Sequence, residues 1–106
     1  MRRLNWALWK VTADSLASLG IHEGDVRLFD HSPEATAAPK TGSVVLVHIS
    51  DREDSEKSTT ILRQYVHPDL IVTNRPGTNI AVRLDHPNFV GRVTGVMIED
   101  DPEAEK

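Results

Sequence analysis

The stretch VTADSLASLGIHEGD, residues 11–25, places a serine at a bend of the chain. Apolar alternation gives way to Asp14-Ser15-Leu16 and then to two glycines, a pattern typical of a strand, a tight turn and the start of a second strand. A serine hydroxyl at such a corner can act as a nucleophile only when a neighbouring base removes its proton. The chemistry of Ser15 therefore depends on which base the fold brings to it.

Asp14, Gly24 and Asp25 surround this serine, and turn chemistry explains all three. An aspartate at a strand-to-turn junction commonly accepts hydrogen bonds from backbone N–H groups of the turn. Glycine relieves a tight turn, and an aspartate after it can close the turn. We therefore predict that these residues hold the corner and take no part in a reaction.

The composition fits one small domain. The 106 residues are 39% hydrophobic and include no cysteine, which excludes disulfides, thiolate zinc sites and cysteine nucleophiles. A domain of this length buries about 60 to 65% of the surface of its unfolded chain. The opening MRRLNWALWK has an apolar run too short for a signal peptide or a membrane span. We expect a soluble, cytoplasmic protein that does not bind a membrane.

The negative charge is concentrated at the C-terminal end. The net charge is −4, and residues 99–106 (EDDPEAEK) hold five acids and one lysine, so residues 1–98 carry eleven acids and eleven bases. A neutral body has no basic stripe to collect phosphates, which argues against direct binding of nucleic acid. We predict a domain over residues 1–98 and a disordered acidic tail over residues 99–106.

Period-two alternation predicts an all-β domain with about seven short strands. Residues 15–20 (SLASLG) give at most one short helical turn, and residues 31–42 and 50–58 are expected to be a Pro/Ala linker and a charged, mobile loop. The predicted strands lie in the segments LWKVTA, DVRLFD, SVVLVHI, TTILRQYV, DLIVT, NIAVRL and RVTGVMI.

Residues 11–98 resemble the LexA/UmuD family of serine–lysine self-cleaving peptidase domains, the C-terminal domains of SOS and phage repressors, which are related to signal peptidases. The resemblance is carried, in order and spacing, by VTADSLASLGIHEGD, VRLFD, TGSVVLVHI, TTILRQYVHPDLIVTN and VGRVTGVMI. It implies a compact, strongly bent β domain that is usually dimeric through its C-terminal part. In active members a serine attacks a peptide carbonyl, and a buried, neutral lysine takes its proton.

The resemblance assigns the nucleophile position to Ser15 and the lysine position to Leu62, because the segment Ile61-Leu62-Arg63-Gln64 stands where active relatives have Val-Lys-Arg-Leu. Leucine cannot accept a proton. If the register is shifted by one residue, Arg63 takes the position, and arginine stays charged at any relevant pH. Both registers predict a serine without its lysine.

No other base is evident from the sequence. None of the four lysines lies at the centre of an apolar strand, and Lys57 precedes Leu62 by an odd number of residues, so it faces the other side of a strand. The five histidines are expected at the surface or at strand edges. No pair of them has the spacing of metal ligands, so we expect no metal and no cofactor.

The residues before Ser15 contain no Ala-Gly or Cys-Gly dipeptide, the kind of bond that self-cleaving relatives cut. The resemblance therefore implies a catalytically inactive domain that serves dimerisation or docking of a protein partner in an SOS, phage-repressor or related regulatory system. Candidate surfaces for this binding are the segment RVTGVMI and the side chains of Trp6 and Trp9. The alternative for the two tryptophans is that they fill the hydrophobic core. The alternative is an active serine peptidase or amidase that uses Ser15 with an unrecognised base.

Overall fold

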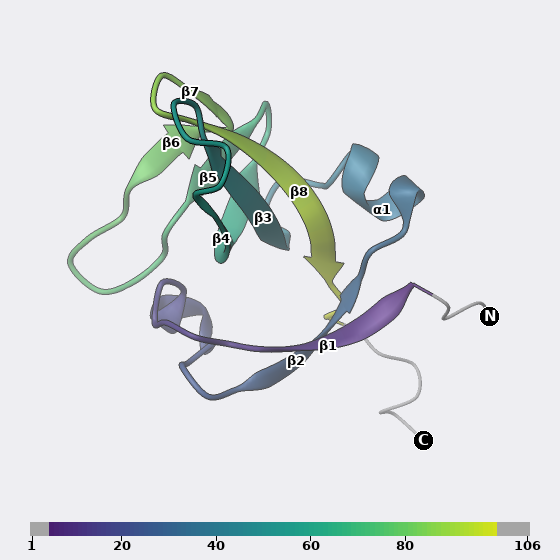
Figure 1. Ribbon diagram of the computed structural model, residues 1–106. Helices are drawn as coiled ribbons and strands as arrows, with labels where there is room; N and C mark the ends of the chain where they lie inside the picture. The colour runs from purple at the N-terminus through teal and green to yellow at the C-terminus, as the bar shows by residue number, and fades with distance from the viewer. Residues whose placement is uncertain (1–4, 100–106) are drawn as a thin grey trace.

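The computed structural model describes residues 5–99, which form one antiparallel sheet of eight strands (Figure 1). The helical structure consists of a 3-10 turn at Ala17–Leu19 and the helix α1 at Pro33–Ala37. The all-β prediction is therefore confirmed. The strands are β1 (Trp6–Lys10), β2 (Val26–Asp30), β3 (Val44–Asp51), β4 (Ser58–Val66), β5 (Leu70–Val72), β6 (Ala81–Arg83), β7 (Asp85–His86) and β8 (Phe89–Met97).

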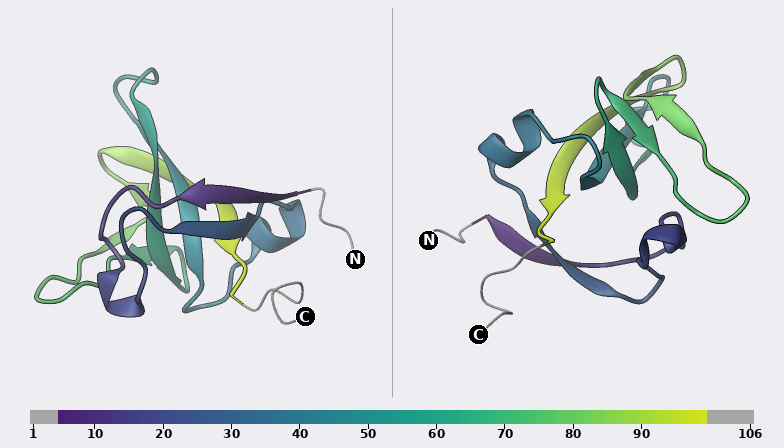
Figure 2. Two further views of the ribbon diagram at one scale, coloured as in Figure 1. Left: turned by 90° about the horizontal axis from the view of Figure 1, so that it is seen from below. Right: turned by 180° about the vertical axis from the view of Figure 1, so that it is seen from behind.

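The strands are hydrogen-bonded in the order β1-β2-β8-β3-β4-β5-β6, and β7 pairs with the start of β8. The long, curved β8 runs from the group of strands β3 to β7 to the β1–β2 hairpin, as the right view of Figure 2 shows. The sheet therefore bends around β8, and β1 and β6 stand at the two ends of this strand order. No helix among residues 5–99 has the length and apolar character needed to cross a membrane.

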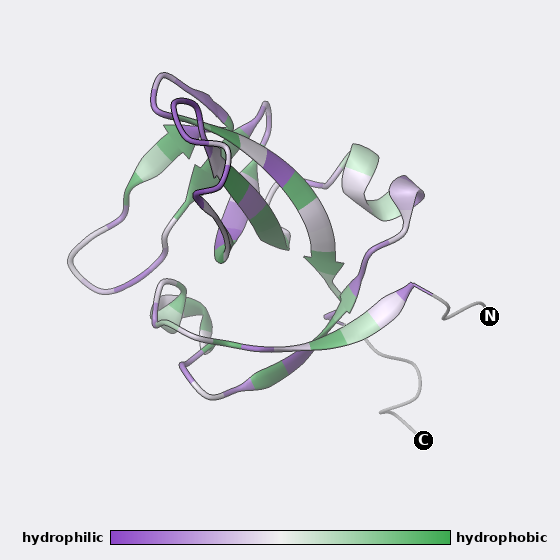
Figure 3. Ribbon diagram, in the orientation of Figure 1, coloured by the Kyte–Doolittle hydropathy of each residue, from purple (hydrophilic) through white to green (hydrophobic). Residues whose placement is uncertain are grey.

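The first half of strand β3, residues 44–47, is buried on both faces and separates two hydrophobic clusters. Val44 and Leu46 face one cluster and Val45 and Val47 face the other, because side chains alternate along a strand. Hydrophobic residues lie mainly on the strands and hydrophilic ones mainly on the turns (Figure 3). The first cluster contains Val11, Leu16, Ile21, Phe29, Val44, Leu46 and Leu62, and the second contains Val45, Val47, Tyr65 and Ile71.

A bulge in β8 contributes to the bend. The register of β8 against β3 shifts between Leu46 and Val47, where Thr94 is the extra residue. The His31 side chain lies over this bulge, with its Nδ1 atom 2.6 Å from the carbonyl oxygen of Thr94. A Cβ atom on Gly95 would lie 2.9 Å from the His31 ring, so glycine permits this close approach.

The predicted Pro/Ala linker over residues 31–42 contains the helix α1, which the sequence analysis missed. The helix begins with a standard cap: the backbone N–H of Ala35 donates to Ser32 Oγ at 3.2 Å, Pro33 occupies the first turn, and Glu34 adds an acid there. The signal Ser-Pro-Glu was therefore present in the sequence, but five residues are too few for a hydrophobic period to show.

The charged loop is shorter than predicted, because β3 extends to Asp51 and β4 begins at Ser58. Aspartate side chains close the remaining turn: Asp51 Oδ1 accepts from the N–H groups of Glu53 and Asp54, at 2.8 and 3.0 Å. Of the predicted acidic tail, only Glu99 lies within the described residues.

Candidate functional site

Ser15 lies in the loop between β1 and β2, directly before a core residue. The Leu16 side chain is buried in the first hydrophobic cluster. The backbone on either side is bonded to the loop after β5, because Asn74 N–H donates to Ser15 O at 2.8 Å and Ser18 N–H donates to Asn74 O at 2.9 Å. These contacts fix the half-buried Ser15 against the end of the sheet that carries β4 and β5.

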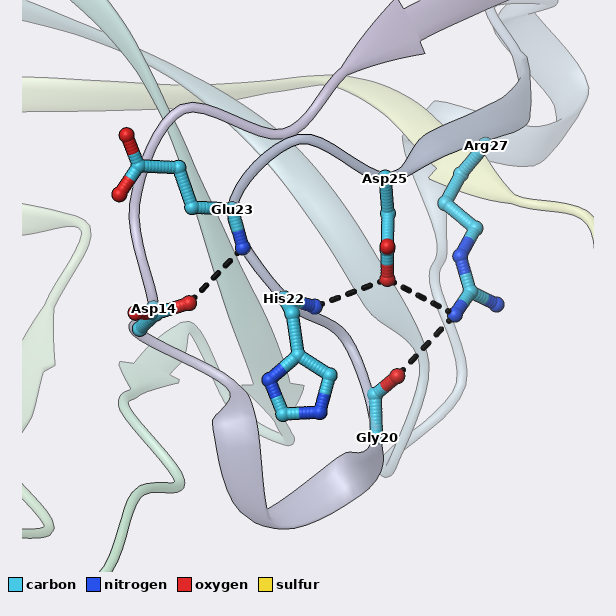
Figure 4. A network of polar contacts seen from close by, with 6 residues as sticks. All are labelled: Asp14, Gly20, His22, Glu23, Asp25 and Arg27. Carbon is cyan, nitrogen blue, oxygen red and sulfur yellow. Dashed lines mark hydrogen bonds and ion pairs between the residues drawn. The ribbon is translucent and has the colours of Figure 1, made fainter.

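The corner around Ser15 is held by the side chains that turn chemistry predicted (Figure 4). Asp14 Oδ1 accepts from Glu23 N–H at 2.8 Å, and Asp25 Oδ2 accepts from His22 N–H at 2.9 Å. Gly24 has φ +97°, a left-handed conformation that favours glycine. The structural roles predicted for Asp14, Gly24 and Asp25 agree with these contacts.

The corner network also includes Arg27. Its Nη2 atom donates to Gly20 O at 3.2 Å and lies 3.3 Å from Asp25 Oδ2 (Figure 4). The pKa of Asp25 lies below its ordinary value, chiefly because its carboxylate accepts the backbone N–H of His22 and also because the Arg27 guanidinium is near. This half-buried arginine thus has a carboxylate partner.

Arg63 is the residue that contacts the Ser15 hydroxyl. Its Nη1 atom lies 3.0 Å from Ser15 Oγ and donates to Leu62 O at 2.8 Å. Burial lowers the pKa of the Arg63 guanidinium, and among residues 5–99 no carboxylate forms an ion pair with it. Arginine nevertheless keeps its proton at neutral pH, so Ser15 Oγ faces a donor and not a base.

Leu62, the residue to which the resemblance assigned the missing lysine, lies in the core. Its side chain is buried in the first cluster and pairs across the sheet with Leu46 of β3. The residue that reaches Ser15 is Arg63, the next one along β4. Neither residue can remove a proton from the serine.

The remaining candidate bases do not reach Ser15. Lys10, Lys40 and Lys57 are exposed, and Lys106 lies outside the described residues. Among residues 5–99 no imidazole is bonded to Ser15 Oγ: the ring of His31 contacts Thr94, and that of His86 accepts a hydrogen bond from the loop at Asn88 and stacks on Phe89. No group of three metal-ligating side chains was found in the same range.

Trp6 and Trp9, the two tryptophans considered as binding surfaces, differ in their surroundings. Trp9 packs against the first hydrophobic cluster, with its Nε1 atom buried and without a hydrogen-bond partner among the described residues. Trp6, at the start of β1, is half-buried.

Comparison of the chain with family models, curated proteins and solved structures finds no match. The LexA/UmuD resemblance therefore stays a prediction.

Proposed function

We propose that this domain works by binding and not by catalysis. It is a LexA/UmuD-like domain without a working dyad, and it serves dimerisation or the docking of a protein partner in an SOS, phage-repressor or related regulatory system. The observation that carries the proposal is the hydrogen bond of 3.0 Å from Arg63 Nη1 to Ser15 Oγ. The family and the regulatory setting rest on the sequence resemblance alone.

The contact with Arg63 makes Ser15 a poor nucleophile for two reasons. A protonated guanidinium can only donate, so it takes no proton from the hydroxyl. The same hydrogen bond engages a lone pair of Oγ, the electron pair that would attack a carbonyl carbon. Guanidinium deprotonation lies far above neutral pH, so a moderate rise in pH supplies no base.

Exposed apolar side chains support a binding role. Leu8 of β1 is 71% exposed and Val26 of β2 is 56% exposed. Large apolar side chains that gather on one open face are typical of surfaces that meet another protein. The domain thus combines an unsuitable nucleophile with an apolar surface.

Labelling with a serine-directed fluorophosphonate, across a series of pH values, tests the proposal. The expected result is that the wild-type protein is labelled no faster than Ser15→Ala at any pH between 6 and about 9. Ser18→Ala is the matched control, because Ser18 is an exposed serine of the same loop that makes no contact with Arg63.

Stoichiometric labelling that Ser15→Ala abolishes and Ser18→Ala preserves would overturn the proposal. It would show an activated serine and support the alternative of a peptidase or amidase. An active serine hydrolase is added to the same reaction as a positive control, and its labelling confirms that the probe is reactive at each pH.

A further inference from the structure

Strand β1 has an open edge. It pairs with β2 on one side, and among residues 5–99 no strand pairs with it on the other. The opposite edge of the sheet, β6, is only three residues long, and short edge strands resist further pairing. In contrast, β1 is five residues long and pairs with β2 without a bulge or a proline. It is the longer and more regular template for another strand.

Backbone hydrogen bonds just beyond the two ends of β1 show which residues point to this edge. Val11 N–H donates to Asp25 O and Val11 O accepts from Gly24 N–H, both at 2.8 Å, and Asn5 O accepts from His31 N–H at 2.8 Å. Odd-numbered residues therefore turn their backbone groups toward β2. Because the direction alternates along a strand, the even-numbered Leu8 and Lys10 turn theirs toward the open edge.

The side chains of the same residues lie on the outer face of the hairpin. Directly paired residues share a face, and the pairs on this face include Leu8 with Leu28 and Lys10 with Val26. Phe29 and Trp9 lie on the inner face, against the first cluster. An open backbone edge thus adjoins an exposed apolar face.

We infer that β1 pairs with β1 of a second copy of the chain, antiparallel about a two-fold axis through Leu8. Leu8 is the middle residue of the strand, so an axis there centres β1 on its copy and pairs Ala7 with Trp9 and Leu8 with Leu8. The two Leu8 residues then exchange two backbone hydrogen bonds. The inference rests on the proposed binding role and names the partner as a second copy.

The sequence of β1 is complementary to itself in this register. The two Lys10 ammonium groups lie at opposite ends of the strand pair, so like charges do not face each other. On the inner face a small alanine lies opposite a large tryptophan. Closed two-fold symmetry of this kind makes a dimer and not an open chain of subunits.

A Leu8→Cys variant tests the register directly, because the chain has no cysteine of its own. In a hydrogen-bonded antiparallel pair the two Cα atoms lie about 5.5 Å apart, within the range that a disulfide spans. We expect a covalent dimer under mild oxidation. Val26→Cys is the matched control: in the paired dimer the two β2 strands lie three strand spacings apart, about 14 Å, so it stays monomeric.

Sedimentation of the wild-type protein and of two lysine variants, none of which contains a cysteine, provides the second measurement. We expect a concentration-dependent dimer whose dissociation constant rises at least tenfold in Leu8→Lys, since two ammonium groups then meet at the axis. Ile80→Lys is the matched control. It adds the same charge at a residue that is 56% exposed and lies next to β6, at the other end of the strand order, so we expect it to leave the dimer intact.

Three results would overturn the inference: a wild-type monomer at every concentration, equal crosslinking of the Leu8→Cys and Val26→Cys variants, or equal weakening by both lysine variants. Circular dichroism of each variant verifies that it is folded. Each of these results leaves the labelling test of Ser15 unchanged, so a failure of this inference is distinguishable from a failure of the proposed function.

Discussion

Two arginines, Arg27 and Arg63, hold the two sides of the loop between β1 and β2, and they differ in the groups that accept their hydrogen bonds. Arg27 is half-buried and donates to a carbonyl of the loop and to the carboxylate of Asp25, two residues away. Arg63 is also half-buried, comes from β4, and donates to the hydroxyl of Ser15, 48 residues away, and no carboxylate among residues 5–99 pairs with it.

The difference shows two ways in which the same loop is held. The corner with Arg27 is closed by local charge and turn geometry. The contact with Ser15 depends on the fold, and there a half-buried cation is bonded to a hydroxyl and a carbonyl oxygen. Such a cation is less hydrated than a surface one, so its hydrogen bonds carry more of its stabilisation.

The largest effect is expected from Leu16→Ala, which removes the anchor that both contacts share. Leu16 is 1% exposed among Val11, Phe29 and Leu62. Loss of a buried leucine leaves a cavity, so we expect the free energy of unfolding to fall by about 3 kcal/mol in urea denaturation. The matched control is Leu19→Ala, at a partly exposed leucine of the same loop. Equal losses in the two variants would show that Leu16 does not anchor the loop.

The comparison of the two arginines is tested by Arg63→Met and Arg27→Met. We expect Arg63→Met to lower the free energy of unfolding by about 1 kcal/mol, because the lost charged hydrogen bonds outweigh the relief of burying a cation. Arg27→Met is expected to cost about 0.5 kcal/mol or less, since exposed ion pairs contribute little.

Salt separates the two arginine contacts further. The effect of Arg27→Met should vanish in about 1 M NaCl, where the Debye length is near 3 Å, whereas that of Arg63→Met should remain. Urea denaturation at low and high salt measures both effects. If the Arg63→Met effect is as sensitive to salt as that of Arg27→Met, the description of Arg63 as a half-buried cation bonded to neutral oxygens is wrong.

The sequence predicted the local features well and the contact at Ser15 only in part. Seven predicted runs overlap β1 to β6 and β8, but the first of them, residues 8–13, shares only residues 8–10 with β1. The Asp14 and Asp25 bonds follow from turn chemistry. The two-residue β7 and the five-residue α1 are too short to produce a period. Whether Leu62 or Arg63 reaches Ser15 depends on how β4 lies against a loop 48 residues away, which no local pattern encodes.

The smallest effect concerns the acid dependence of the corner. The pKa of Asp25 is lowered in the folded protein, mainly by the hydrogen bond from His22 N–H, with Arg27 as a further cause. A carboxylate with a lowered folded pKa stabilises the protein above its unfolded pKa of about 3.9, and this contribution is lost as the pH falls through the folded value.

The urea midpoint of the wild type should therefore exceed that of Asp25→Asn at pH 6 and approach it below about pH 4. Glu23→Gln removes one negative charge from the same loop and controls for the change in net charge. A gap between the wild type and Asp25→Asn that persists undiminished at pH 2 would mean that the carboxylate's ionised form does not hold the corner.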